Sequence, residues 1–265
     1  MPRPTDDGRG ETPTLIAHQG FADVYPGNTL AAMRGAASDG AAMIELDVQC
    51  CADGEVVVFH DPRLDESTDK GGRVTETPCE VVLDAEVRNS GETIPTLKAV
   101  LGEIPTDVGV NVELKKPVSP ERTTGRAATD DARDGGERPT NERVARWLPL
   151  VEHTLEVLDK HNHPSLLLSS FHVPALAAVR EIDTTVPVAP LFADATERAF
   201  TAARRYDAAA INPSIRCTTR ELVDRAHGAG LAVNAYTVTR SAQAARLRRL
   251  GVDGVIADSA SVLDV

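Results

Sequence analysis

The chain has 265 residues, of which 42% are hydrophobic, enough to form the core of one α/β barrel or of two smaller domains. Its 40 acidic and 28 basic residues give a formal charge of -12 at pH 7, which argues against nonspecific binding to nucleic acid or to an anionic membrane surface. No stretch approaches the roughly 18 apolar residues of a membrane-spanning helix, so we expect no integral membrane segment.

Residues 1–13 are polar and lack the apolar centre of a signal peptide, so we expect a soluble, cytoplasmic protein. The four cysteines show neither zinc-ligand spacing nor the framework of a small secreted domain, and we expect free thiols.

Short apolar runs alternate with longer helical patterns along the chain, as in βα units around a parallel sheet. Eight runs are strand candidates: Thr14–Ala17, Met43–Val48, Gly109–Leu114, Leu166–Ser169, Val186–Leu191, Ala208–Ile211, Ala232–Tyr236 and Gly254–Ala257. Eight such units in about 250 residues predict a single α/β domain of the (β/α)8 TIM-barrel type. A doubly wound sheet is the alternative.

Helical patterns lie between these strands, and several begin with Asn, Ser or Thr near the first turn. The helix candidates include Thr29–Ser38, Arg143–Lys160, Pro174–Ile182, Thr219–Ala229 and Ser241–Leu250.

Two segments interrupt the alternation. Asp61–Pro95 contains turn-forming pairs and little periodicity, which predicts a small insertion after the second strand, over the face formed by the carboxyl ends of the strands. Ser119–Glu142 has no aromatic residue and no aliphatic residue larger than Ala, so we predict a mobile loop.

The strand Met43–Val48 has an apolar face and an acidic face, and the acidic face carries Glu45 and Asp47. In a barrel these two carboxylates point into the lumen. Burying two like charges is costly unless a cation or hydrogen-bond donors compensate, which favours a metal site or a phosphate-handling site. An edge strand with a solvated face is the alternative.

The segment Asn111–Lys115 repeats this alternation, with Glu113 and Lys115 on the polar face. Both strands end where barrel enzymes place catalytic groups. Three carboxylates without a thiolate cluster suit a hard divalent cation, Mg²⁺ or Ca²⁺, better than zinc.

Two of the seven histidines directly follow predicted extended segments. His18 follows Thr14–Ala17, and His60 follows Val56–Phe59. An imidazole has a pKa of roughly 6.5, so two histidines beside a phosphate could serve as general acid and general base.

A series of short motifs resembles the glycerophosphodiester phosphodiesterases in order and rough spacing, over about Leu15 to Asp258. The motifs are His18-Gln19-Gly20, Pro26-Gly27-Asn28-Thr29, Glu45-Leu46-Asp47-Val48, Asp53-Gly54, His60-Asp61, Glu113-Leu114-Lys115 and Gly251 to Asp258. This resemblance implies a (β/α)8 barrel with a small insertion after the second strand.

By position, the resemblance makes Glu45, Asp47 and Glu113 metal ligands, and His18 and His60 the acid/base pair. It also makes Lys115 a phosphate contact, and it places Ser170-Phe171 and Tyr236 in the pocket wall, where the family often has Trp at the position of Tyr236.

Two departures fall in these motifs. Gln19 stands where the family usually has Arg, and Gly27 stands where it usually has Glu. As a substrate-binding residue, Gln19 would donate hydrogen bonds but no charge, so we expect weaker phosphate affinity. If the usual Arg and Glu pair, losing both leaves no orphan charge.

The resemblance implies metal-dependent hydrolysis of a small-molecule glycerophosphodiester to sn-glycerol 3-phosphate and an alcohol. Two alternatives stay open: a lysophospholipase D-type diesterase and a non-catalytic phosphodiester-binding barrel. Separately, only five of the 28 basic residues are Lys, and with the acidic surface this gives the hypothesis of a halophilic protein.

Overall fold

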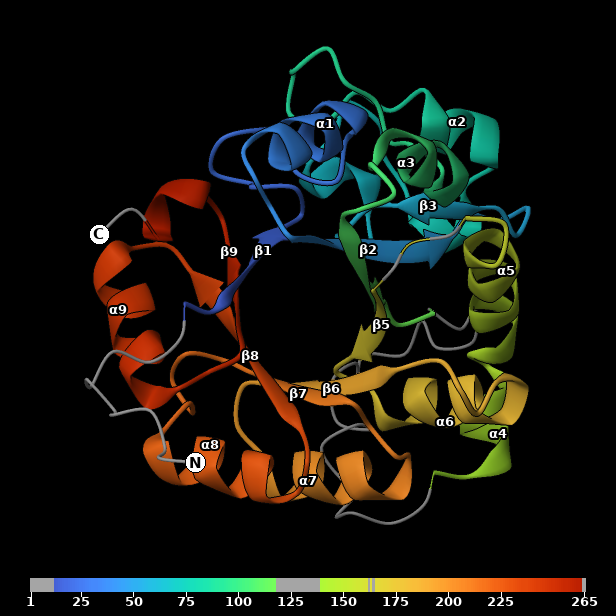
Figure 1. Cartoon of the computed structure of the whole chain (residues 1–265). Coiled ribbons are helices and arrows are strands. Elements are labelled where there is room, and N and C mark those ends of the chain that lie inside the picture. Colours follow the sequence, from blue (N-terminus) through green and yellow to red (C-terminus); the bar gives the residue numbers. More distant parts are fainter. Residues whose placement is uncertain (1–11, 118–138, 162, 164, 264–265) are drawn as a thin grey trace.

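Eight parallel strands close into a barrel in this computed structural model, which describes residues 12–117, 139–161, 163 and 165–263. The strands follow one another around the barrel as β1-β9-β8-β7-β6-β5-β4-β2, and pairing of β2 with β1 closes it (Figure 1). They are β1 Thr14–His18, β2 Met43–Cys50, β4 Gly109–Leu114, β5 Leu166–Ser170, β6 Val188–Phe192, β7 Ala210–Pro213, β8 Ala232–Val238 and β9 Gly254–Ala257. The predicted (β/α)8 barrel is confirmed, although β6 and β7 each begin two residues later than predicted. The doubly wound alternative is wrong.

Helices surround the barrel (Figure 1). They are α1 Leu30–Ser38, α2 Cys79–Leu83, α3 Leu97–Glu103, α4 Asn141–Ala145, α5 Leu148–Leu158, α6 Val173–Ile182, α7 Thr196–Arg205, α8 Arg220–Gly228 and α9 Ser241–Leu250. Threonine side chains cap several of them; the Thr29 hydroxyl, for example, accepts a hydrogen bond from the Ala32 amide at the start of α1. Among the helices that the structure describes, none has the length and apolar composition needed to cross a membrane.

The single helix predicted over Arg143–Lys160 is wrong. The chain forms α4, turns at Arg146 and Trp147, and starts again as α5. Pro149 lies in the first turn of α5, where its missing amide hydrogen costs nothing, whereas it would break the interior of a longer helix. Most of the loop predicted over Ser119–Glu142 lies outside the described residues, but its last two residues, Asn141 and Glu142, are helical.

The outward faces of the strands form the main core against the helices. Ile44, Leu46 and Val48 on β2 are fully buried, as are Val112 and Leu114 on β4. They belong to one apolar cluster that also includes residues of α1, α3 and α5. Since these side chains point outward, the alternate positions on the same strands point into the lumen.

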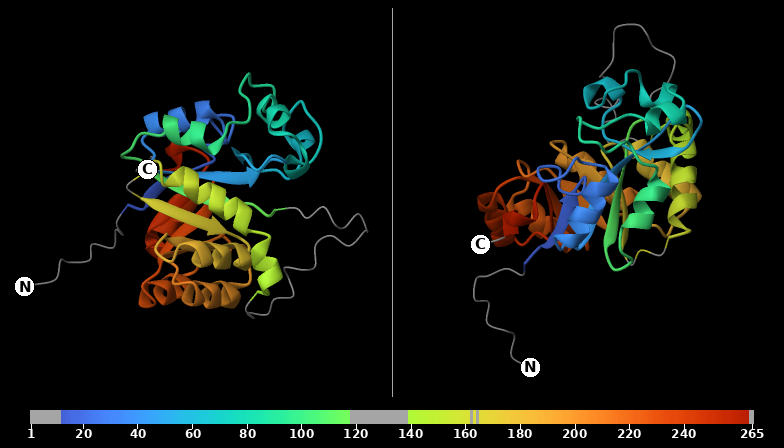
Figure 2. Two further views of the ribbon diagram at one scale, coloured as in Figure 1. Left: turned by 90° about the vertical axis from the view of Figure 1, so that its right-hand side faces the viewer. Right: turned by 90° about the horizontal axis from the view of Figure 1, so that it is seen from above.

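The segment between β2 and α3 forms the insertion. It contains β3 Val56–Val58, which pairs antiparallel with β2, the 3-10 helices η1 Leu64–Glu66 and η2 Val74–Glu76, and α2. Figure 2 shows it projecting beyond the end of the barrel toward which the strands run. Its buried apolar residues form a separate small core, which includes Val57, Phe59, Leu64, Val74, Val82 and Ile94.

Candidate active site

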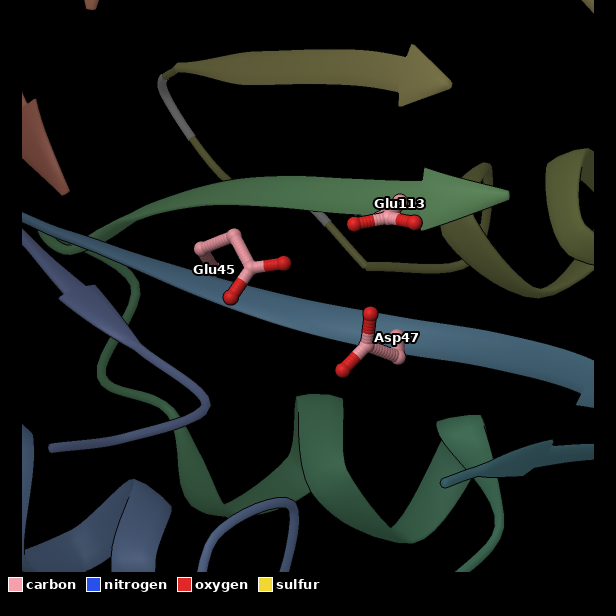
Figure 3. A group of neighbouring side chains, drawn as sticks. All are labelled: Glu45, Asp47 and Glu113. Atoms are coloured by element: carbon pink, nitrogen blue, oxygen red, sulfur yellow. The ribbon is translucent and has the colours of Figure 1, made fainter. Parts of the chain in front are cut away.

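Three carboxylates meet inside the barrel, as the strand alternation predicted. Glu45 and Asp47 come from β2 and Glu113 from β4 (Figure 3). Asp47 and Glu113 are directly paired across the two strands, and one oxygen from each of the three residues lies within 4.8 Å of the others. Each of the three residues is at most 8% exposed. This geometry would let the three side chains bind one cation together.

The protonation of these carboxylates reflects their crowding. Burial raises the pKa of Glu45 and of Glu113 to about 7, and the charge of Asp47 adds to the rise in both. Burial also opposes ionisation of Asp47, but the charges of Lys115 and His60 and a hydrogen bond from Asn28 outweigh it and lower the pKa. A cation in the cluster would hold all three groups ionised at neutral pH.

Lys115 follows β4 and contacts two members of this cluster. Its Nζ donates to Glu113 Oε1 at 2.8 Å and lies 3.4 Å from Asp47 Oδ1. Burial would lower the pKa of the ammonium group, yet these carboxylates raise it above its ordinary value. Lys115 is therefore a fixed positive charge beside the carboxylates.

Two amide side chains hold Asp47 from the other side. Gln19 Nε2 and Asn28 Nδ2 each donate to Asp47 Oδ2 at 2.8 Å, and Asn28 Oδ1 accepts from the Asp47 amide at 3.2 Å. The Gln19 backbone amide also donates to Glu45 Oε2 at 3.0 Å. Asn28 was not predicted as a site residue, although it lies in the Pro26–Thr29 motif. Gln19 thus contacts two of the three carboxylates.

His18, the last residue of β1, binds a carboxylate that sequence reasoning missed. Its Nδ1 lies 2.5 Å from Asp258 Oδ1, just after β9. Burial would lower the pKa of His18, but the hydrogen bond to Asp258 and the charges of Glu45 and Asp258 raise it to about 9. The two residues are 240 positions apart, so no local pattern links them. The only sequence signal for Asp258 was its place at the end of the motif Gly251 to Asp258.

His60 lies in the insertion, two residues after the end of β3, and its side chain is half exposed. Its Nδ1 is 2.8 Å from Asp61 Oδ1, and Asp61 also accepts a hydrogen bond from the Ser67 hydroxyl. Burial opposes ionisation of Asp61, but these two hydrogen bonds lower its pKa. Both predicted acid/base histidines therefore have a carboxylate on Nδ1.

Six of the predicted site residues line one cavity of about 240 Å³: His18, Glu45, His60, Glu113, Phe171 and Tyr236. Phe171 packs edge-on against Tyr236, with ring centroids 5.7 Å apart. The other three predicted residues, Gln19, Asp47 and Lys115, do not line this cavity. They form a connected group, because Gln19 and Lys115 both contact Asp47. The strands and the insertion thus bring all the predicted residues to one end of the barrel.

Comparison with known proteins places this chain in a family. The sequence model of the glycerophosphoryl diester phosphodiesterase family matches residues 18–262. A glycerophosphodiester phosphodiesterase of Caldanaerobacter subterraneus subsp. tengcongensis is 28% identical over 257 residues, covering 94% of this chain and 95% of the relative. One of Bacillus altitudinis is 29% identical over 255 residues, covering 92% and 94%. The solved structure of an Oleispira antarctica phosphodiesterase in complex with its product sn-glycerol-3-phosphate is similar, with a TM-score of 0.79, 25% identity and coverage of 96% and 98%. This chain belongs to the glycerophosphoryl diester phosphodiesterase family.

Proposed function

We propose that the protein hydrolyses glycerophosphodiesters in a metal-dependent reaction that releases sn-glycerol 3-phosphate and an alcohol. The observation that carries the proposal is the cavity in which two carboxylate-bound histidines adjoin a buried carboxylate cluster. Membership in the family and the product named for the Oleispira antarctica structure support it.

Glu45, Asp47 and Glu113 would hold the metal ion. The cluster consists of hard oxygen donors only, which suits Mg²⁺ or Ca²⁺, and its buried negative charge calls for a compensating cation. When bound, such an ion supplies positive charge that stabilises the phosphoryl oxygens as their negative charge develops.

His18 and His60 would move the protons of the reaction. In each of them Nδ1 is engaged by a carboxylate, so Nε2 is the atom that would exchange a proton with the substrate. One histidine would take the proton of the attacking oxygen, and the other would give a proton to the leaving alkoxide. Asp258 and Asp61 would orient the rings, and Asp258 would also stabilise the imidazolium form of His18.

Lys115 would contact the phosphate. Its ammonium group lies beside Asp47 and Glu113, so it is close to a phosphate bound at a metal ion that these carboxylates hold. Phe171 and Tyr236 would form the wall against the carbon atoms of the substrate. Gln19 directs Nε2 at Asp47, so a contact of Gln19 with the substrate would use the second hydrogen of the amide.

The test is release of glycerol 3-phosphate from glycerophosphocholine and glycerophosphoethanolamine, with Mg²⁺, Ca²⁺ or EDTA, in dilute buffer and in high salt. We expect release that requires the ion and that is lost in His60→Ala. If Mg²⁺ or Ca²⁺ raises the melting temperature but no diester is cleaved, the protein is a phosphodiester-binding barrel instead.

A further inference from the structure

Of the two proposed acid/base histidines, His60 is the one that no barrel strand carries. His18 is the last residue of β1, whereas His60 belongs to the insertion and has a half-exposed side chain. The residue before it, Phe59, is buried in the separate small core of the insertion. The distance from the His60 ring to the carboxylate cluster therefore depends on how this segment is attached to the barrel.

The side chain of Gln49 on β2 makes that attachment. Its Nε2 donates to the carbonyl oxygen of Phe59 and to the carbonyl oxygen of Asp61, each at 2.8 Å. These two residues directly precede and directly follow His60. A side-chain amide nitrogen carries two hydrogens, so both are used here. One side chain thus holds the backbone on both sides of the imidazole.

Gln49 is itself fixed in the barrel. Its side chain is buried, and Gln49 shares the inward face of β2 with Glu45 and Asp47. Its backbone is paired with Val57 of β3. A second bond connects the same two segments, because the Phe59 amide donates to the Asp47 carbonyl at 2.9 Å. The strand that carries two of the proposed metal ligands therefore also holds the segment that carries the imidazole.

The attachment includes the carboxylate that engages His60. Asp61 Oδ1 lies 2.8 Å from His60 Nδ1, and the carbonyl of the same Asp61 is bound by Gln49. Holding both carbonyls restricts backbone rotation at His60 and at Asp61, so the ring and its carboxylate keep one position relative to β2. Gln49 is not among the residues that line the 240 Å³ cavity, which His60 does line. Its contacts are thus with the backbone that carries His60.

We infer that Gln49 is a positioning residue, which acts on the reaction through His60 by holding the imidazole at a fixed place relative to the carboxylate cluster on β2. The inference rests on the proposed function, in which His60 exchanges a proton with the substrate. A displacement of a reacting group by about 1 Å can lower the rate about 100-fold, so the attachment bears directly on kcat.

Gln49→Met tests the inference, because it keeps the length of the side chain and removes both donors. With glycerophosphocholine and Mg²⁺, we expect kcat to fall about 10- to 100-fold. The value of KM and the affinity for Mg²⁺ in calorimetric titration should stay at the native values, because His60 holds neither the substrate nor the ion in the proposed reaction. If Gln49 only supported β2, the affinity for Mg²⁺ would fall together with kcat, since Glu45 and Asp47 lie on that strand. That result, or an unchanged kcat, would overturn the inference.

Gln243→Met is the matched control. Gln243, in the first turn of α9, also makes two hydrogen bonds to backbone groups, since its Oε1 accepts from the amides of Thr239 and Arg240 at 2.9 and 3.1 Å. The melting temperature should fall in both variants, but kcat should fall only in Gln49→Met. An equal fall of kcat in the control would contradict a specific role of Gln49.

Gln49→Asn serves if Gln49→Met does not fold. It keeps a polar amide at this position but shortens the side chain by one methylene, which withdraws the amide from the two carbonyls. We expect the same pattern, a lower kcat with native affinity for Mg²⁺. A native kcat in Gln49→Asn would overturn the inference.

A failure of the proposed function gives a different result. If the native protein cleaves no diester, hydrogen exchange tests the attachment alone. Exchange of the Phe59 amide, which is bonded to the Asp47 carbonyl, should accelerate in Gln49→Met and stay native in Gln243→Met. Unchanged exchange of this amide in Gln49→Met would show that Gln49 does not hold the segment, which overturns the inference.

Discussion

The side chain of Gln19 fills the space that a side chain at Gly27 would occupy. A Cβ atom added at Gly27 would lie 2.8 Å from Gln19 Oε1 and 3.1 Å from Gln19 Cβ, closer than ordinary van der Waals contact. Gln19 keeps its present position, with Nε2 on Asp47, only while residue 27 has no side chain. The two departures from the family's usual motifs are therefore coupled through space, and each accommodates the other.

Gly27→Ala should displace Gln19 and thereby loosen Asp47. We expect the affinity for Mg²⁺ to fall about 10-fold or more, as is usual when a residue that orients a metal ligand is lost. Calorimetric titration with Mg²⁺ measures it. In a Gln19→Ala background the same substitution should have a smaller effect, because the amide oxygen that would lie 2.8 Å from the added Cβ is gone. Gly102→Ala is the control, since a Cβ there would meet nothing within 4 Å. Additive losses in the double variant would contradict the coupling.

Asp258→Asn should lower the pKa of His18, because it removes the carboxylate that holds the imidazolium. In the folded, metal-free protein this pKa is about 9, against an ordinary 6.5. The protonated ring therefore stabilises the fold fully below about pH 6.5, and this contribution is lost as the pH rises through about 9. In the variant, the loss should occur at lower pH and be smaller.

An NMR titration of the metal-free protein measures this pKa directly, with the His18 resonance assigned as the one missing in His18→Gln. Melting temperatures at pH 6 and pH 9 provide the stability side. The same His18 midpoint in Asp258→Asn and in the native protein would show that Asp258 does not set the charge of the ring.

Lys115→Met should separate metal binding from catalysis. Without the ammonium group beside Glu113 and Asp47, the cluster is more negative, so Mg²⁺ should bind more tightly, by about tenfold or roughly 1.4 kcal/mol. The value of kcat/KM should still fall about 100-fold, because the positive charge that we propose to contact the phosphate is lost. Lys116→Met removes the same charge at the next position and should do neither. Weaker Mg²⁺ binding in Lys115→Met would refute this account.

Leu64→Ala tests whether the insertion positions His60. Leu64 is fully buried in the core of the insertion, and truncating a buried leucine costs about 2–5 kcal/mol. Hydrogen exchange should accelerate within residues 61–95 more than in the barrel strands, and kcat should fall with it. Val81→Ala, at a position that is 37% exposed, should change neither. Undiminished kcat together with accelerated exchange would mean that His60 is held by the barrel alone.

The part of the site that could be predicted lies on regular strands. Alternation along β2 and β4 placed Glu45, Asp47 and Glu113 in the lumen. A strand that buries its apolar face against the helices must turn its other face toward the inside of the barrel. The barrel itself followed from the repeated apolar runs.

The missing part depends on contacts between distant segments. Asp258 reaches His18 only because β9 pairs with β1, and Asn28 reaches Asp47 from a loop in which Asn28 has a φ of 62°. The prediction of one helix over Arg143–Lys160 was wrong because the helical pattern of apolar residues continues across the turn at Arg146 and Trp147.

Because of the contact between His18 and Asp258, the recovery of catalytic activity can be used to follow the closure of the barrel during folding. One partner belongs to the first strand and the other follows the last, and they lie 240 positions apart. Contacts between residues this far apart in the sequence form late, because closing such a long loop costs conformational entropy. During refolding from denaturant, catalytic activity should therefore return after helical circular dichroism, and the lag between the two signals would time the closure of the barrel.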